Sequence, residues 1–169
     1  VSQSTSYEID DLEGLQVLQT LCANSSFDSS AYTFILSDNI DMSSISDWSG
    51  ISNFKGKLYG NGHTISGLTG TKGLFASVNG ATIEDLKLDN VNVTGGTHAS
   101  ALVCDGYGDI TVNNCVVNIT NLKTIKNSYN INHKYINIES LPSINSLRTN
   151  TENNDLFAPT PRNNNKNNN

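Results

Sequence analysis

The chain has 169 residues, which is enough for one domain with a sizeable core but hardly for two. Hydrophobic residues make up 36% of the chain and charged residues 15%, while 25 Asn and 20 Ser supply much of the rest. This composition favours strands and turns over helices. The net charge of −6 excludes a basic surface for nucleic acid. No apolar stretch approaches the roughly 18 residues of a membrane-spanning helix, so we expect no membrane insertion.

Composition divides the chain into an acidic, glycine-punctuated part and an Asn-rich part. Residues 1–120 hold 13 acidic and 4 basic side chains, whereas residues 121–169 hold 3 acidic and 6 basic ones and 15 of the 25 Asn. We therefore expect a folded domain over 1–120, a last strand or cap within 121–140, and an Asn-rich tail over 141–169. No leader is visible before Val1, which favours a mature secreted protein or a fragment of a longer one.

The first predicted element is an amphipathic helix over residues 9–22. Apolar side chains recur there at three-residue spacing, and Asp10 and Asp11 stand where carboxylates complement the free amides of a helix N-terminus. We expect this helix to cap the N-terminal end of the fold. The β-rich run YTFIL at 32–36 then predicts a strand.

Short apolar segments repeat from residue 64 onward. The pattern TISGL at 64–68 aligns with TIEDL at 82–86, an offset of 18, and the latter aligns with TVNNC at 111–115, an offset of 29. A second pair, GLFA at 73–76 and ALVC at 101–104, is offset by 28. Such segments, separated by Gly- or Asn-rich turns, are typical of the successive coils of a β-solenoid.

Stacking of these coils predicts which side chains share a column. We expect Ile65, Ile83 and Val112 to form one buried column. Leu68, Leu86 and Cys115 would form the next one, and Thr64, Thr82 and Thr111 would face outward together.

The run FKGKLYGNGHTISGL at 54–68 is the most specific pattern in the chain. It resembles the opening of the GLUG-repeat proteins, and GLF at 73–75, GATIEDL at 80–86 and VNVTG at 91–95 resemble the continuation of that repeat. The resemblance covers about residues 7–120, although Ala76 and Cys104 replace glycines of the family pattern. Members are right-handed parallel β-helices of secreted or cell-surface proteins, many of them adhesin-like. The resemblance therefore implies that fold and location, and it brings no catalytic residues with it.

Cysteines and glycosylation sequons are the first candidate modification sites. Cys22, Cys104 and Cys115 lack a metal-binding spacing; burial as small apolar residues is favoured for the last two, and a Cys104–Cys115 disulfide is the alternative in an oxidising compartment. Asn-x-Ser/Thr sequons begin at Asn24, Asn92 and Asn118.

Residues with catalytic or metal-binding chemistry do not form a recognisable motif. Glu84 and Asp85 are sequence neighbours with no matching acid on the flanking repeats, so they predict a solvated pair rather than a glycosidase dyad. The segment DGYGD at 105–109 predicts a glycine turn, since it lacks the spacing of a Ca²⁺ loop. His63, His98 and His133 share no metal-ligand spacing. The sequence thus predicts no catalytic site, no cofactor, no metal site and no enzyme activity.

Two functions remain open from the sequence. The first is a non-catalytic extracellular or cell-surface module with a structural or adhesive role, whose partners are other protein chains. Such a module could form a homo-oligomer or filament through its ends or its tail, because open sheet edges carry unpaired backbone groups. The alternative is a carbohydrate-binding or polysaccharide-processing β-helix that contacts surface glycans through Trp48, Tyr59 and Tyr107. That alternative requires these aromatic side chains to share one surface.

Overall fold

The computed structural model describes residues 5–95, 98–124 and 134–136. Within these ranges the protein is mostly β-strand with parallel sheets and little helix, which confirms the all-β class. The elements, in chain order, are β1 (Thr5–Ile9), α1 (Leu12–Ala23), the 3-10 turn η1 (Ser29–Ala31), β2 (Tyr32–Leu36), β3 (Ile40–Asp41), β4 (Lys57–Tyr59), β5 (Thr64–Ser66), β6 (Thr69–Gly70), β7 (Phe75–Asn79), β8 (Thr82–Glu84), β9 (Lys87–Gly95), β10 (Val103–Tyr107), β11 (Thr111–Asn113), β12 (Val116–Thr124) and β13 (Lys134–Ile136).

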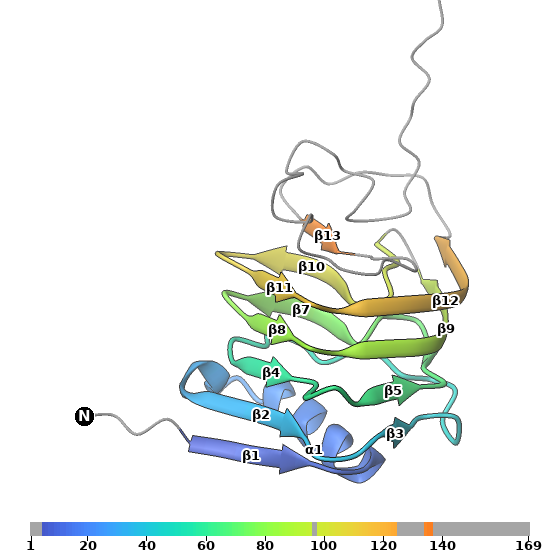
Figure 1. The fold of residues 1–169 in the computed structure, drawn as a ribbon. Helices are drawn as coiled ribbons and strands as arrows, with labels where there is room; N and C mark the ends of the chain where they lie inside the picture. Colours follow the sequence, from blue (N-terminus) through green and yellow to red (C-terminus); the bar gives the residue numbers. More distant parts are fainter. Residues whose placement is uncertain (1–4, 96–97, 125–133, 137–169) are drawn as a thin grey trace, which may run out of the picture.

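The described strands form three sheets, and the chain contributes strands to them in a fixed order. Sheet A has the strand order β1-β2-β4-β8-β11, sheet B has β12-β9-β5-β3 with β6 also paired to β9, and sheet C has β13-β10-β7. From β4 to β12 the chain passes from A to B to C and then returns to A, and each pass lies beside the previous one (Figure 1). All described pairs are parallel except β10 with β13.

The register confirms two of the three predicted alignments. Val112 lies opposite Ile83, as the offset of 29 predicts, and Val103 lies opposite Phe75, as the offset of 28 predicts. The offset of 18 is wrong, because Ile83 pairs with Leu58 instead of Ile65.

The two aligned segments 64–68 and 82–86 belong to different sheets. Ile65 is in sheet B, opposite Ile40 and Leu88, and the first Thr of that segment, Thr64, pairs with Lys87. Thr82 and Thr111 do pair, but in sheet A. Both segments are short strands that run into a turn, so their similarity reflects the same local strand-to-turn geometry and not a stacked pair.

The predicted buried columns change accordingly. In sheet A the column is Phe34, Leu58, Ile83 and Val112, and in sheet B it is Ile40, Ile65, Leu88 and Val117. All of these side chains are buried. Leu68 is buried beside β6, whose Thr69 pairs with Asn92, so it does not continue the column of Leu86 and Cys115.

Large aromatic side chains fill the core between the sheets near the N-terminal end. The rings of Phe34 and Phe54 have centroids 5.9 Å apart, and those of Phe54 and Phe75 are 4.9 Å apart. Phe54 and Phe75 are fully buried, and this packing joins the segment before β4 to sheets A and C.

Helix α1 begins later than predicted, at Leu12. Asp11 is its N-cap, and the Asp11 side chain accepts a hydrogen bond from the Gly14 amide at 2.8 Å. The spacing assigned Ile9 to the helix, but Ile9 is the buried last residue of β1. This strand was not predicted, because the residues before Ile9 are mostly polar. Leu15, Leu18 and Cys22 enter the core cluster, so α1 covers apolar side chains near β1 and β2 (Figure 1).

Described strands continue beyond residue 120. Strand β12 continues to Thr124, and β13 lies in the segment 121–140 where a last strand or cap was predicted, antiparallel to β10. The predicted tail over 141–169 lies outside the described residues. In the part of the chain that the structure describes, no helix is long and apolar enough to cross a membrane.

Candidate functional site

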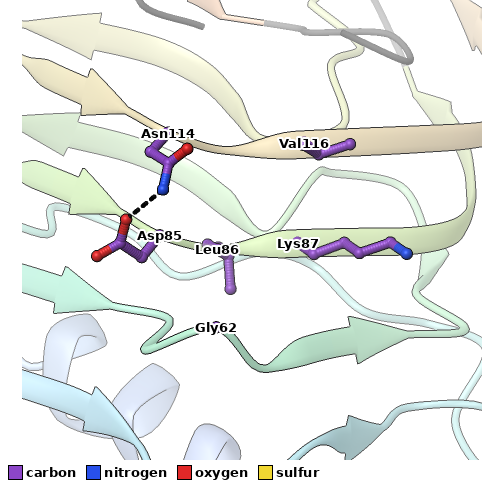
Figure 2. A pocket seen from close by; sticks show the side chains of 6 residues that line it. All are labelled: Gly62, Asp85, Leu86, Lys87, Asn114 and Val116. Carbon is purple, nitrogen blue, oxygen red and sulfur yellow. Dashed lines mark hydrogen bonds between the residues drawn. The ribbon is translucent and has the colours of Figure 1, made fainter. Parts of the chain in front are cut away.

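A shallow open pocket lies at the corner where the chain turns from sheet A into sheet B. Its volume is about 280 Å³, and it is lined by Gly62, Asp85, Leu86, Lys87, Asn114 and Val116 (Figure 2). Asp85 and Leu86 join β8 to β9, while Asn114 precedes β12. The pocket therefore belongs to neighbouring turns of successive passes of the chain.

Two polar residues with left-handed backbone hold this corner. Asp85 has φ 54° and Asn114 has φ 53°, a region that Asp and Asn tolerate better than other residues with a side chain. The Asn114 Nδ2 donates to Asp85 Oδ1 at 2.6 Å (Figure 2). Because the hydrogen bond joins equivalent positions 29 residues apart, it ties one pass to the next.

The pocket offers few chemical groups for a bound molecule. Its lining includes one carboxylate, one side-chain amide and one lysine, together with Leu86, which is 2% exposed. The Lys87 side chain runs along β9, away from the bond between Asp85 and Asn114 (Figure 2). Throughout the described ranges, no three His, Cys, Asp or Glu side chains gather as a metal site.

The outer face of sheet B carries a ladder of polar side chains, which we call the β9–β12 ladder. Its hydrogen bonds run from Asn118 Nδ2 to Asp89 Oδ1 at 3.1 Å, from Thr120 Oγ1 to Asn90 Oδ1 at 2.7 Å and from Asn121 Nδ2 to Asn92 Oδ1 at 2.9 Å. Each bond joins β12 to β9. This ladder was not predicted from the sequence, although the offset of 29 aligns two of its three pairs, Asn118 with Asp89 and Asn121 with Asn92.

The aromatic residues proposed for glycan contact do not share a surface. Trp48 is 2% exposed, and its Nε1 donates to Gly73 O at 3.1 Å inside the protein. Tyr59 belongs to β4 in sheet A, whereas Tyr107, 41% exposed, belongs to β10 in sheet C. The carbohydrate-binding alternative required these three side chains to share one surface, and they do not.

The three sequons differ in their surroundings. Asn24 is exposed just after α1, and its Oδ1 accepts a hydrogen bond from the Ser26 amide at 2.9 Å. Asn92 and Asn118 are half-buried members of the β9–β12 ladder.

All three cysteines are free and buried. Burial raises the pKa of Cys22 and that of Cys115 to about 11, and burial also raises the pKa of Cys104. This state agrees with their interpretation as small apolar residues and not with a Cys104–Cys115 disulfide.

A histidine–carboxylate pair was not predicted. His98 Nδ1 lies 3.0 Å from Asp105 Oδ1, and both side chains are mostly buried. Asp105 is in β10, which ends at Tyr107. The predicted glycine turn therefore begins only after that strand, at Gly108, whose φ is 71°. His63 lies in the turn between β4 and β5, and His133 is outside the described residues.

The acidic pair predicted to be solvated divides between two faces. Glu84 is half-buried on sheet A and lies opposite Tyr59 and Asn113, while Asp85 is exposed at the pocket. The two carboxylates therefore do not converge on one site.

Comparison with known proteins identifies a family. The family model described as the M26 IgA1-specific metallo-endopeptidase N-terminal region matches residues 28–119, more than half of the chain. The chain belongs to this family of metallo-endopeptidase N-terminal regions. The matched range contains all strands from β2 to β11 and the start of β12. No curated protein and no solved structure matches the chain significantly.

This family membership corrects two expectations. The resemblance to GLUG-repeat proteins, and with it the adhesin-like assignment, is wrong, because the matching family is that of the M26 N-terminal regions. The expectation of no enzyme activity is also contradicted, since the matching family is the N-terminal region of a metallo-endopeptidase. The strand and turn pattern of residues 54–95 therefore predicted the β-rich class correctly and the family wrongly.

Proposed function

We propose that this M26 N-terminal region is a right-handed parallel β-helix that serves an extracellular metallo-endopeptidase as a rigid structural region. The observation that carries the proposal is the fixed order of sheets A, B and C, with parallel pairing at every described step from β4 to β12. Parallel strands joined by crossovers are nearly always right-handed.

The structural role follows from where the bonding groups lie. Apolar columns fill the interior, and the β9–β12 ladder and the corner bond between Asp85 and Asn114 link successive passes on the outside. The pocket described above is shallow and open. A stack of passes linked in this way is rigid, and it would hold other parts of a protein at a fixed distance.

A duplication of one whole pass tests the β-helix. Repeating residues 82–110 between Ile110 and Thr111 inserts 29 residues, the separation of Asp85 and Asn114 on successive passes. We expect the longer protein to fold, with Trp48 still buried in fluorescence and an unfolding free energy no lower than before. The control repeats only residues 82–95, which supply strands for sheets A and B but none for sheet C. The proposal fails if the whole-pass duplication unfolds the protein while the control does not.

A binding measurement tests the structural role. The family description names IgA1, so the full chain is immobilised and exposed to IgA1 and to other immunoglobulins. A structural region gives no saturable signal with any of them. Saturable binding that prefers IgA1 would instead assign the chain to capture of the peptidase substrate. Light scattering of the same preparation reports whether copies of the chain assemble.

A further inference from the structure

We propose that Asn24 is the N-glycan acceptor of this protein, and that the sequons at Asn92 and Asn118 stay unmodified in the folded molecule. The inference rests on the extracellular location in the proposed function. The sequon at Asn24 ends in Ser and those at Asn92 and Asn118 end in Thr, and the sequence pattern does not single out Asn24. The preference for Asn24 is argued from the structure.

Asn24 lies where a glycan meets no neighbouring strand. It is the C-cap of α1, and its backbone N–H bonds to Leu21 O. Its side chain uses the carbonyl oxygen for a local bond with the Ser26 amide, at 2.9 Å, while the glycan is carried by the other atom, Nδ2. Asn24, Ser25 and Ser26 are all exposed. A sugar at Nδ2 therefore leaves the bonds of this turn in place.

Asn118 uses the glycan-bearing atom for a structural bond. Its Nδ2 lies 3.1 Å from Asp89 Oδ1, and the Thr120 hydroxyl of the same sequon donates to Asn90 at 2.7 Å. Neighbouring strands are about 4.8 Å apart, so a sugar ring on Nδ2 displaces the Asp89 carboxylate. A chain glycosylated here must give up part of the β9–β12 ladder to fold.

One residue, Asn121, contacts both ends of the sequon at Asn92. Asn121 Nδ2 donates to Asn92 Oδ1 at 2.9 Å and lies 3.4 Å from Thr94 Oγ1. The bond to Asn92 uses Oδ1, as at Asn24, so the obstacle to a glycan here is position. Asn92 is half-buried in the middle of β9, beside β12, and is not in an exposed turn. A sugar on its Nδ2 would therefore crowd the contact between β9 and β12.

The modification requires a lipid-linked oligosaccharide diphosphate and a glycosyltransferase. Asn24 Nδ2 forms a bond to C1 of the first sugar, the bond from C1 to the diphosphate oxygen breaks, and the diphosphate leaves with the electron pair. The proton lost from Nδ2 passes to a base of the transferase. Because transfer acts on chains that have not yet folded, the structure determines which modified chains then reach the folded state.

The test is site occupancy in the full chain, secreted from eukaryotic cells behind an added signal peptide. Enzymatic deglycosylation in heavy-oxygen water marks each former acceptor, and peptide mass spectrometry then reads the marks in the folded, secreted pool. We expect the mark at Asn24 alone, giving one glycan per chain, and none in Ser26→Ala, which removes the sequon but keeps the backbone bond. The matched controls Asn92→Gln and Asn118→Gln should keep the single glycan.

Two results overturn the proposal. One is an unmarked Asn24 in the secreted chain, and the other is a mark at Asn92 or Asn118 in molecules whose thermal unfolding matches that of the unmodified protein. Since secretion is imposed by the added signal peptide, either result concerns the site itself. An unmodified Asn24 in protein from its natural source, beside a modified one in the secreted chain, would contradict only the extracellular location.

Discussion

At the scale of single residues, two glycines in the same turn have different roles. A Cβ on Gly60 would overlap the Asp85 carbonyl and the Leu86 Cα, which are backbone atoms of the next pass. A Cβ on Gly62 meets nothing, but its φ of 80° disfavours other residues. The first glycine permits close stacking of two passes, and the second permits the turn itself.

Replacing these glycines by alanine should therefore give unequal losses. Gly62→Ala should lower the unfolding free energy by about 1–2 kcal/mol, the cost of left-handed backbone for a residue with a Cβ. Gly60→Ala should cost at least twice as much or prevent folding, because neither overlapping atom is at the flexible end of a side chain. Urea unfolding of both variants measures the difference. Equal losses would contradict the stacking of this turn on Asp85 and Leu86.

The buried thiols make a prediction about pH. Burial raises the pKa of Cys22 and Cys115 from 9.0 to about 11 and also raises that of Cys104. At pH 8 we expect a thiol reagent to modify no cysteine in the native protein and all three in urea, since only exposed thiolates react.

The same shifts set the sign of the alkaline stability. In the unfolded chain the thiols ionise near pH 9, whereas in the folded protein they keep their protons, so the unfolding free energy should fall as pH rises from about 9 towards 11. A titration of urea midpoints measures this fall, and Cys115→Ser serves as a control that removes one contributing group. In the thiol-reagent experiment at pH 8, reaction of the native protein as fast as that of an exposed thiol would contradict the burial of the cysteines.

At the scale of elements, the β9–β12 ladder determines how two strands of sheet B hold together. The uncharged amide of Asn118 donates a hydrogen bond to the Asp89 carboxylate across these strands. Asn118→Asp places two carboxylates opposite each other, and we expect a loss of about 1 kcal/mol at pH 7.

A reciprocal exchange is the control for this pair. Asp89→Asn combined with Asn118→Asp restores one amide and one carboxylate at the same two positions, so stability at pH 7 should recover most of the loss. Thermal unfolding of the single and double variants gives the coupling. Additive losses with no recovery would show that the two side chains do not interact.

At the scale of the whole molecule, the sequence predicts the kind of fold better than its register. Apolar alternation and glycine turns are local signals, and they correctly indicate parallel β-structure and the pairing of Ile83 with Val112. Register between passes depends on turn length: Gly60–His63 joins β4 to β5, but only Asp85 and Leu86 join β8 to β9. Ile83 lies in sheet A and Ile65 in sheet B, so the true partner of Ile83 is Leu58 of sheet A.

Candidate site residues were predicted less well, because burial and contact depend on the whole fold. Trp48 is attractive as an exposed aromatic in the sequence, yet its indole is buried and bonded to Gly73 O. The pair of His98 and Asp105 is separated by only a few residues, but β10 must form before the two side chains meet.

The position where the folded part ends gives a last prediction. A chain that stops at Thr120 cuts β12 in the middle and removes β13, so it loses the pairs of Asn121, Leu122, Lys123 and Thr124 with β9 and the pairing of β13 with β10. A chain that stops at Ser140 keeps all of these described pairs. We expect the shorter chain to unfold at a lower urea concentration than the full chain, and the longer one to match the full chain.

Trp48 provides the measurement, since it is the one tryptophan in the sequence and lies buried against Gly73 and Leu74. Its fluorescence should shift to longer wavelength when the core opens, and the midpoint of that shift compares the three lengths. Equal midpoints for all three chains would mean that the pairs beyond residue 120 contribute nothing to the core. The composition boundary near residue 120 would then also be the structural one.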